Sequence, residues 1–135
     1  CVKDAILDAG IEAKDIDYIS GHLTATSKDA TEIQNLAEAL NRSAKNFPYI
    51  NSLKALTGHC LSAAGSIETV ATILQLTENF VAPNKNCEDL NPEITAIIDA
   101  KCIPQILLNK EINIAAKVSF GFGDVNGCII IKKYS

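Results

Sequence analysis

The two histidines of this chain stand in equivalent places, each beside a glycine and just after a predicted strand. His22 follows IDYISG, and His59 follows FPYINSLKALTG. In open α/β sheets, the carboxyl ends of the strands form the edge at which ligands bind. Either histidine alone is more simply explained as a packed imidazole with one satisfied hydrogen bond. The two together, each with hydroxyl-bearing neighbours, predict a reaction site at this edge.

His59 falls in the first turn of a predicted long helix over 57–79. The helix dipole disfavours an imidazolium there and keeps the ring neutral. A neutral ring can donate a hydrogen bond to a developing oxyanion, which is an electrophilic rather than a basic role. Lys54 lies in the turn before this helix. Its spacing alone favours a solvated lysine; buried beside a carboxylate such as Glu32, it would instead orient a histidine.

Thr24 and Thr26 alternate after His22, which turns both hydroxyls to the side of the imidazole. Hydroxyls in this arrangement suit an amide-rich or phosphate-bearing ligand. They suit equally well a capping role between the loop and the next helix. Asp29 is predicted to be the N-cap of that helix.

No cysteine is placed as a nucleophile beside the histidines. The five cysteines are scattered and never in a CxxC spacing, which argues against a zinc site and a disulfide framework. Cys60 adjoins His59, but neighbouring helical residues point about 100° apart and do not face each other. Cys128 precedes three isoleucines of a predicted strand. Both thiols are therefore interpreted as packing groups.

The segment GFGDVNG, residues 121–127, has the spacing GxGxxxG and is followed by a predicted strand. A dinucleotide-binding loop has a different glycine spacing and leads into a helix. The segment instead predicts a tight hairpin turn with Asn126-Gly127. Its backbone could still present an N–H group to a substrate.

An alternation of helices and strands must position these residues. Periodicity predicts helices over 2–9, 29–41 and 57–79, with one further turn over 92–97. Strands are predicted over 16–22, 47–52, 112–120 and 128–133, the last two as a pair. Small residues in the first half of the long helix indicate close backbone contacts, so this helix is predicted to be buried. The order is that of a layered α/β fold.

The composition excludes some classes of partner. A net charge of −4 and an aromatic content of 5% argue against a nucleic-acid groove. No apolar stretch reaches the length of a membrane span, and the N-terminal CVKDAILDAG does not resemble a signal peptide. A cytoplasmic protein is therefore predicted. Because Cys1 opens directly into a predicted helix, the chain is also expected to be a piece of a longer one.

Three motifs in series carry a family resemblance. HLTATS (22–27), KALTGH (54–59) and SFGFGDVNG (119–127) resemble HGTST, KxxxGH and NSFGFGGTN, in the same order. These are signatures of the elongating β-ketoacyl-acyl carrier protein synthases, which are condensing enzymes of the thiolase superfamily. The resemblance covers essentially the whole chain. It implies an α/β fold, a thiolase-like C-terminal half with a mixed sheet and a buried long helix, lacking its first strand.

Carried over residue by residue, the resemblance implies a Cys-His-His site in which His22 and His59 are the two histidines. Lys54 matches the lysine that supports them, with Glu32 as its acidic partner. Thr24 and Thr26 match threonines that contact a phosphopantetheine arm. Phe122 matches a gate to the acyl pocket, with its backbone N–H as an oxyanion donor. The rest of the third motif is assigned to substrate binding or to support of the site: Phe120, Gly121, Gly123 and Asn126.

The implied reaction is a decarboxylative Claisen condensation of an acyl thioester with malonyl-acyl carrier protein, in fatty-acid or polyketide and polyene biosynthesis. No metal or redox cofactor is implied, because the phosphopantetheine arrives on the acyl carrier protein. The implied partners are that carrier protein, the N-terminal half of the synthase, and a second subunit in a homo- or heterodimer. Neither nucleic acid nor a membrane is implied.

Some residues depart from the family pattern. Leu23 stands where the family has glycine, Ala25 where it has serine, and Asp124-Val125 where it has Gly-Thr. These changes imply a distinct subfamily, such as one serving a specialised fatty-acid or polyene pathway.

The family's nucleophilic cysteine lies in the N-terminal half, so residues 1–135 are predicted to be an incomplete domain segment that is inactive by itself. The strands around 16–20 and 112–119 are expected to lack a central strand that both would pair with. One alternative is a non-catalytic partner subunit, against which the retention of both histidines and Lys54 argues. A thiolase-type degradative enzyme is a weaker alternative, because Cys128 does not fit its second cysteine.

Overall fold

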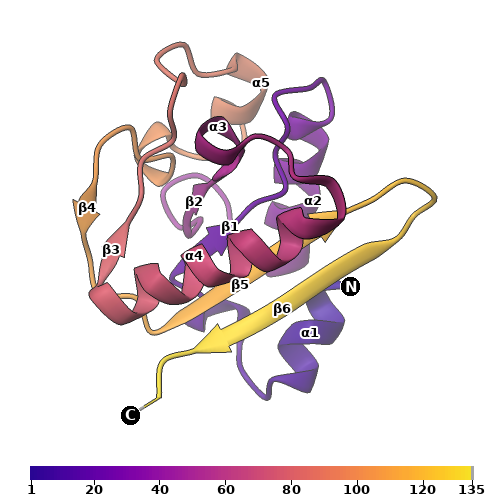
Figure 1. Ribbon diagram of the computed structural model, residues 1–135, viewed down its shortest axis with the longest axis vertical. Helices are drawn as coiled ribbons and strands as arrows, with labels where there is room; N and C mark the ends of the chain where they lie inside the picture. The colour runs from indigo at the N-terminus through magenta and orange to yellow at the C-terminus, as the bar shows by residue number, and fades with distance from the viewer. Residues whose placement is uncertain (135) are drawn as a thin grey trace.

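A mixed β-sheet forms the centre of the computed structural model, which describes residues 1–134. Its strands run in the order β2-β1-β5-β6, with β1 and β2 parallel, β1 and β5 parallel, and β6 antiparallel to β5 (Figure 1). The strands are β1 (Tyr18–Ser20), β2 (Tyr49–Asn51), β5 (Ile114–Phe120) and β6 (Asn126–Lys132). A separate small ladder pairs β3 (Phe80–Val81) with β4 (Leu108–Asn109).

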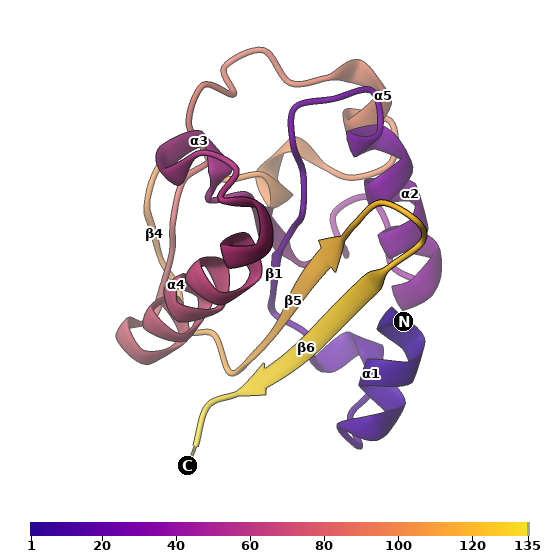
Figure 2. The same ribbon diagram turned by 45° about the vertical axis from the view of Figure 1, so that its right-hand side comes forward.

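Helices cover both faces of this sheet. Helices α1 (Val2–Asp8) and α2 (Asp29–Leu40) lie on one face, and α4 (Ala64–Glu78) crosses the other (Figures 1 and 2). The short helices α3 (Lys54–Thr57) and α5 (Pro92–Thr95) lie in the connections, α5 beside α2. Single 3₁₀ turns form at Ala13–Asp15, Leu61–Ala63 and Ala100–Cys102. The layered α/β architecture predicted from the sequence is confirmed.

The main core lies between the sheet and α1 and α2. Ile33, Leu36 and Leu40 recur at helical spacing along α2 and are almost fully buried there. In β5, side chains alternate between the faces, so Ala116 and Val118 join this core. Ala115, one position away, packs in a second, smaller cluster on the opposite face.

The sheet has no vacant central position. Tyr18 of β1 pairs with Tyr49 of β2 on one side and with Ala115 of β5 on the other. The expectation that β1 and β5 lack a strand between them is therefore wrong. Short parallel strands whose connections run over the helical layers can pair directly, and strand spacing along a sequence does not fix their order in the sheet.

The long helix differs from its prediction in extent. It begins at Ala64 rather than near residue 57, because Gly58 (φ 72°) and Leu61 (φ 50°) have left-handed backbone conformations that an α-helix does not accommodate.

The long helix is also not buried all round. Its buried positions include Glu68, Thr72 and Gln75, whereas Val70 and Leu74 are more than half exposed. The buried side of the helix therefore carries polar groups beside Ala64 and Leu76, and several apolar side chains lie on its exposed side.

The turn between β5 and β6 lies earlier than predicted. The Gly121 N–H donates to the Val125 carbonyl at 2.8 Å, and Gly123 and Asp124 have positive φ values of 75° and 60°. Asn126 is already in β6, where it pairs with Phe120. The prediction of a hairpin is confirmed, but its turn is 121–125, because positive φ is available at Gly123 and tolerated at an aspartate.

A buried hydrogen-bond network fastens α4 to the sheet. The Tyr18 hydroxyl donates to Asn51 Oδ1 at 2.5 Å and accepts from Gln75 Nε2 at 2.9 Å. Asn51 Nδ2 in turn donates to the Ala82 carbonyl at 2.8 Å. Burial raises the pKa of Tyr18 to about 12, so this hydroxyl keeps its proton throughout the neutral range.

The Tyr18→Phe substitution tests this network. It leaves a buried acceptor on Asn51 and a buried donor on Gln75 without the shared hydroxyl, so the free energy of unfolding should fall by about 1–3 kcal/mol. Urea denaturation of this chain measures the change, with Tyr134→Phe, at an almost fully exposed tyrosine, as the matched control. Equal stability of the two variants would contradict the assigned role.

Candidate active site

The peptide groups around His22 are held from both sides. The backbone N–H groups of His22 and Leu23 donate to the two oxygens of the Glu32 carboxylate at 2.7 and 3.0 Å. The His22 carbonyl accepts a hydrogen bond from Lys54 Nζ at 2.5 Å. The loop that leaves β1 is therefore fixed by one acidic and one basic side chain, each from a different helix.

Lys54 forms its ion pair with Glu68 of α4, not with Glu32. Its Nζ lies 2.5 Å from Glu68 Oε1, and the two side chains are 7% and 2% exposed. The prediction that Glu32 is the acidic partner is wrong, because both Glu32 oxygens are engaged by backbone N–H groups. The solvated alternative for Lys54 is wrong as well.

Sequence reasoning missed two residues of this cluster, Glu68 and Lys117. Lys117 Nζ lies 2.8 Å from Glu68 Oε2, and its side chain is 2% exposed. A signal was present: each is a lone charge among apolar and small residues, in GSIETVA and in IAAKVSF. Charged side chains are almost never fully buried unless they are paired, so two such charges indicate partners.

The two histidine rings approach each other across the site. Their centroids are 5.5 Å apart, and the rings are inclined at 80°. His59 Nδ1 accepts the Leu61 N–H at 3.1 Å, so a neutral His59 ring carries its proton on Nε2. His59 lies before Ala64, the first residue of α4, and so outside the first turn of that helix. The neutral donor form expected from a helix dipole is instead fixed by one local hydrogen bond.

His22 is half-buried in a positive environment. Burial lowers its pKa, and electrostatic interactions with Lys54, His59 and Lys117 lower the pKa further, whereas Glu68 opposes them. The ring is therefore uncharged near neutral pH. Its other aromatic neighbour is Phe120, with a centroid separation of 6.2 Å and an inclination of 75°.

The two threonines lie in a loop that Asp29 closes. Thr24 Oγ1 donates to Thr26 Oγ1 at 3.3 Å, so the two hydroxyls lie together. That both face the His22 imidazole stays a prediction. The Asp29 carboxylate accepts the backbone N–H groups of residues 24, 25 and 26 at 3.0–3.3 Å. The helix N-cap is Lys28 rather than Asp29. The Asp29 carboxylate instead stabilises the tight loop before the helix, in which Ala25 has a φ of 58°.

The third motif divides between the site and the solvent. Phe120 reaches His22, whereas Phe122 in the β5–β6 turn is fully exposed. Gly121 and Gly123 shape the turn, and Asn126 begins β6. Because Phe122 is exposed to solvent, its role as a gate stays a prediction.

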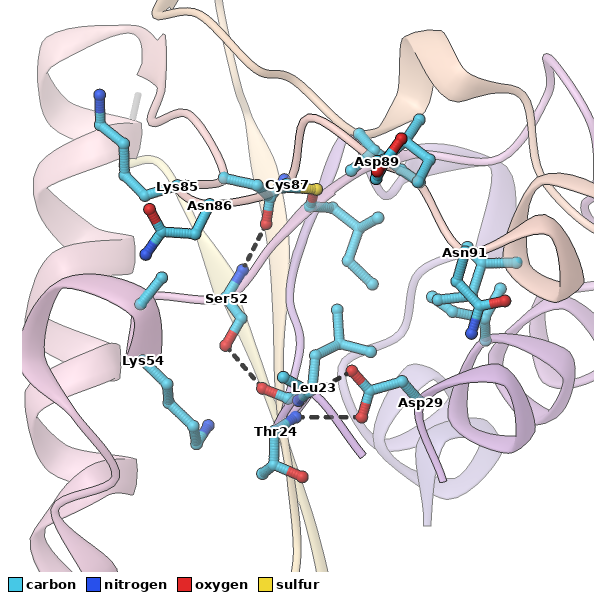
Figure 3. Close-up of a pocket in the computed structure, with 18 of the residues that line it drawn as sticks. Leu23, Thr24, Asp29, Ser52, Lys54, Lys85, Asn86, Cys87, Asp89 and Asn91 are labelled. Atoms are coloured by element: carbon cyan, nitrogen blue, oxygen red, sulfur yellow. Dashed lines mark hydrogen bonds between the residues drawn. The ribbon is translucent and has the colours of Figure 1, made fainter. Parts of the chain in front are cut away.

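A cavity of about 500 Å³ lies next to the histidine pair. Thr24, Lys54 and His59 line it, together with apolar side chains that include Leu23 and Ile33. Figure 3 shows Leu23, Ser52 and Lys54 along one side, with Cys87, Asp89 and Asn91 from the segment after α4 facing them. The site therefore combines neutral hydrogen-bond donors with a pocket that has both apolar and polar walls.

Sequence reasoning did not identify the segment that forms the far wall. Its anchor is Asn84, which accepts the Ser52 N–H at 3.0 Å and donates to the Ile50 carbonyl at 3.0 Å. Burial raises the pKa of the Cys87 thiol in this wall, and Glu88 adds to the effect, so Cys87 is not an activated nucleophile.

Within residues 1–134, no set of three or more His, Cys, Asp or Glu side chains is arranged to hold a metal ion. None of the helices described here combines the length and apolar character that crossing a membrane requires.

Comparisons with known proteins agree on one family. Residues 1–88 match the family described as beta-ketoacyl synthase, C-terminal domain. The chain is 35% identical to the 3-oxoacyl-[acyl-carrier-protein] synthase 2 of Rhizobium meliloti (strain 1021), covering 100% of this chain and 31% of that protein. It is 30% identical to the chloroplastic 3-oxoacyl-[acyl-carrier-protein] synthase I of Hordeum vulgare, covering 99% of this chain and 28% of that protein.

Solved structures give the same result. The ishigamide ketosynthase/chain length factor superposes with a TM-score of 0.89 at 26% identity, over 99% of this chain and 32% of that one. A type II PKS acyl-carrier protein in complex with its ketosynthase bound to the hexaketide gives a TM-score of 0.83 at 30% identity, over 100% and 32%. The chain thus spans about a third of the length of the relatives it matches.

The Glu32 carboxylate gives the site a predicted pH dependence. Burial raises its pKa from 4.5 to about 7, although the His22 and Leu23 N–H groups oppose the rise. Between these two values the folded chain holds a proton that the unfolded chain has released. The free energy of unfolding should therefore decrease as the pH rises through this window.

Glu32→Gln removes the titrating group, so the decrease in stability between about pH 5 and about pH 7 should become smaller than in the unmodified chain. Urea denaturation at both pH values measures it. Glu111→Gln, at an exposed glutamate, is the control that should keep the original dependence. An unchanged dependence in Glu32→Gln would show that Glu32 titrates normally.

Proposed function

This chain belongs to the β-ketoacyl synthase family as its C-terminal domain, and from that premise we propose that it supplies the histidine half of a condensing active site. The complete protein would join an acyl thioester to malonyl-acyl carrier protein by decarboxylative Claisen condensation. The observation that supports this most directly is the convergence of His22 and His59, with ring centroids 5.5 Å apart, beside the pocket that Lys54 and Thr24 line.

The proposed reaction has two halves. In the first, a cysteine thiolate from the remainder of the protein attacks the acyl thioester, and the carrier-protein thiol leaves. In the second, malonyl-acyl carrier protein loses carbon dioxide, and the electrons of the broken carbon–carbon bond form an enolate. The enolate carbon attacks the acyl-cysteine carbonyl, and the thiolate leaves, which gives the β-ketoacyl product and regenerates the nucleophile.

The two neutral imidazoles would donate to the malonyl thioester oxygen as negative charge develops on it. The Nε2–H of His59 is available because Nδ1 is engaged by the Leu61 N–H. Uncharged donors suit this task, since they stabilise the oxyanion by hydrogen bonds and do not transfer their proton to it. Lys54 acts through His22 as a positioning residue, because its ammonium group binds the His22 carbonyl.

The remaining motif residues are assigned to the substrate arm. Thr24 and Thr26 would contact the amides of phosphopantetheine, and Phe122 would gate the acyl pocket with its backbone N–H near the acyl carbonyl. The arm arrives on the acyl carrier protein, and no other cofactor is required. A relative solved in complex with an acyl-carrier protein supports this partner.

We further propose that this chain does not condense substrates without the remainder of the synthase. That remainder would supply the cysteine, and the complete protein would act as a homo- or heterodimer. A non-catalytic partner subunit is the alternative. The engaged Lys54–Glu68 pair and the two facing histidines favour the catalytic role, since a purely structural subunit does not need them. The cytoplasmic compartment stays a prediction.

Substitution of either histidine in the complete synthase tests the catalytic role. His22→Ala and His59→Ala should each lower the rate of β-ketoacyl product formation from acyl- and malonyl-acyl carrier protein by about 10²–10³-fold. Release of carbon dioxide from malonyl-acyl carrier protein should fall in parallel. Mass spectrometry of the carrier-bound products measures the first reaction, and Lys45→Ala, at an exposed lysine, serves as the control. Unmodified rates in both histidine variants would favour the non-catalytic subunit.

A further inference from the structure

The Glu68 carboxylate forms ion pairs with two buried ammonium groups, although one would neutralise its charge. Lys54 lies 2.5 Å from one carboxylate oxygen and Lys117 lies 2.8 Å from the other. All three side chains are at most 7% exposed. With every group ionised, the cluster carries one positive charge in excess. Buried charge without compensation is costly, so a surplus ammonium group at this place does not serve stability.

The other contacts of Lys117 do not balance its charge. Its Nζ donates to the Val118 carbonyl and to Ser119 Oγ, which are both uncharged. Glu32 is a further acidic group that acts on the Lys117 pKa, and that carboxylate is engaged by the His22 and Leu23 N–H groups. The surplus charge therefore acts on the groups around it, and these include the His22 imidazole.

We propose that Lys117 is a positioning residue of the condensing site: its ammonium group gives the buried cluster a net positive charge, and that charge holds the His22 imidazole in its neutral, hydrogen-bond-donating form. This role in catalysis rests on the proposed function, in which a neutral His22 donates a hydrogen bond to the substrate. A positive field at this place also stabilises an oxyanion that forms on the ligand side of His22.

The electrostatics of His22 agree with this role. After burial, the groups that lower the His22 pKa are Lys54, His59 and Lys117, and Glu68 opposes them. The lowering of the His22 pKa cannot be assigned to Lys54 alone, because the Lys54 ammonium group is paired with Glu68 and with the His22 carbonyl. Burial lowers the pKa of Lys117, but its contact with Glu68 opposes the loss of the proton.

The histidine titration of this chain tests the proposal without any activity measurement. The chain has two histidines, and their imidazole proton resonances can be followed by NMR through the pH range and assigned with His22→Ala. Lys117→Met removes the charge with little change of length, so the His22 midpoint should rise by about 0.5–1 pH unit. Lys117→Arg keeps the charge and should leave the midpoint near its original value.

Lys110→Met, at an exposed lysine, is the control for loss of one positive charge elsewhere. Circular dichroism establishes that each variant is folded. Should Lys117→Met fail to fold, the Lys117→Gln variant provides the same charge removal with a polar side chain. An unshifted His22 midpoint in a folded, uncharged variant would overturn the proposal, as would an equal shift in the Lys110 control.

The complete synthase gives a second readout that separates this proposal from the proposed function. Condensation needs neutral His22, so the acidic limb of the pH–rate profile should move to higher pH in Lys117→Met, with the rate recovering at alkaline pH. A synthase without condensing activity, together with a shifted His22 titration, would reject the function and retain the electrostatic role. A condensing synthase with an unshifted His22 titration would retain the function and reject the electrostatic role.

Discussion

The buried Glu68 carboxylate is the constraint on which the rest of the site depends. Burial alone raises the pKa of such a group, but the contacts with Lys117 and Lys54 outweigh burial and hold the pKa below its usual value. The charged carboxylate therefore ties together α4, α3 and β5, which are distant in sequence. Loss of one partner of a buried ion pair typically costs about 3–5 kcal/mol, because the remaining charge is left without compensation. The geometry of the histidine site is thus coupled to the stability of the α4–sheet interface.

The consequence for the site is rigidity in the His22 loop. Glu32 binds the N–H side of this segment, and Lys54 binds its carbonyl side. Hydrogen-bond donors that are fixed before the substrate binds need no rearrangement as charge develops, which is the main source of electrostatic catalysis. The same network explains why α4 faces the sheet with polar groups. The Tyr18–Asn51–Gln75 hydrogen bonds and the Glu68 ion pairs give those groups specific partners, so the interface specifies one register between helix and sheet.

A good part of the fold could be predicted from local pattern. The apolar spacing of α2 gave its buried face, and the apolar runs of β5 and β6 gave a hairpin, because both periodicities follow from backbone geometry. The predictions failed where the backbone departs from regular geometry. The start of α4, the β5–β6 turn and the role of Asp29 all depend on positive φ values at or near these points. Residues other than glycine adopt such values only where the surrounding structure demands them.

The sequence by itself determined the family, the types of most elements, and the positions of His22 and His59 after two predicted strands. These are properties of short motifs and of local periodicity. Only the tertiary structure decided that Lys54 pairs with Glu68 rather than Glu32, that Lys117 joins them, and that β1 lies directly against β5. Periodicity tells which side of an element is buried. It carries no information on which distant charge is brought to it, because that depends on how the layers pack in space.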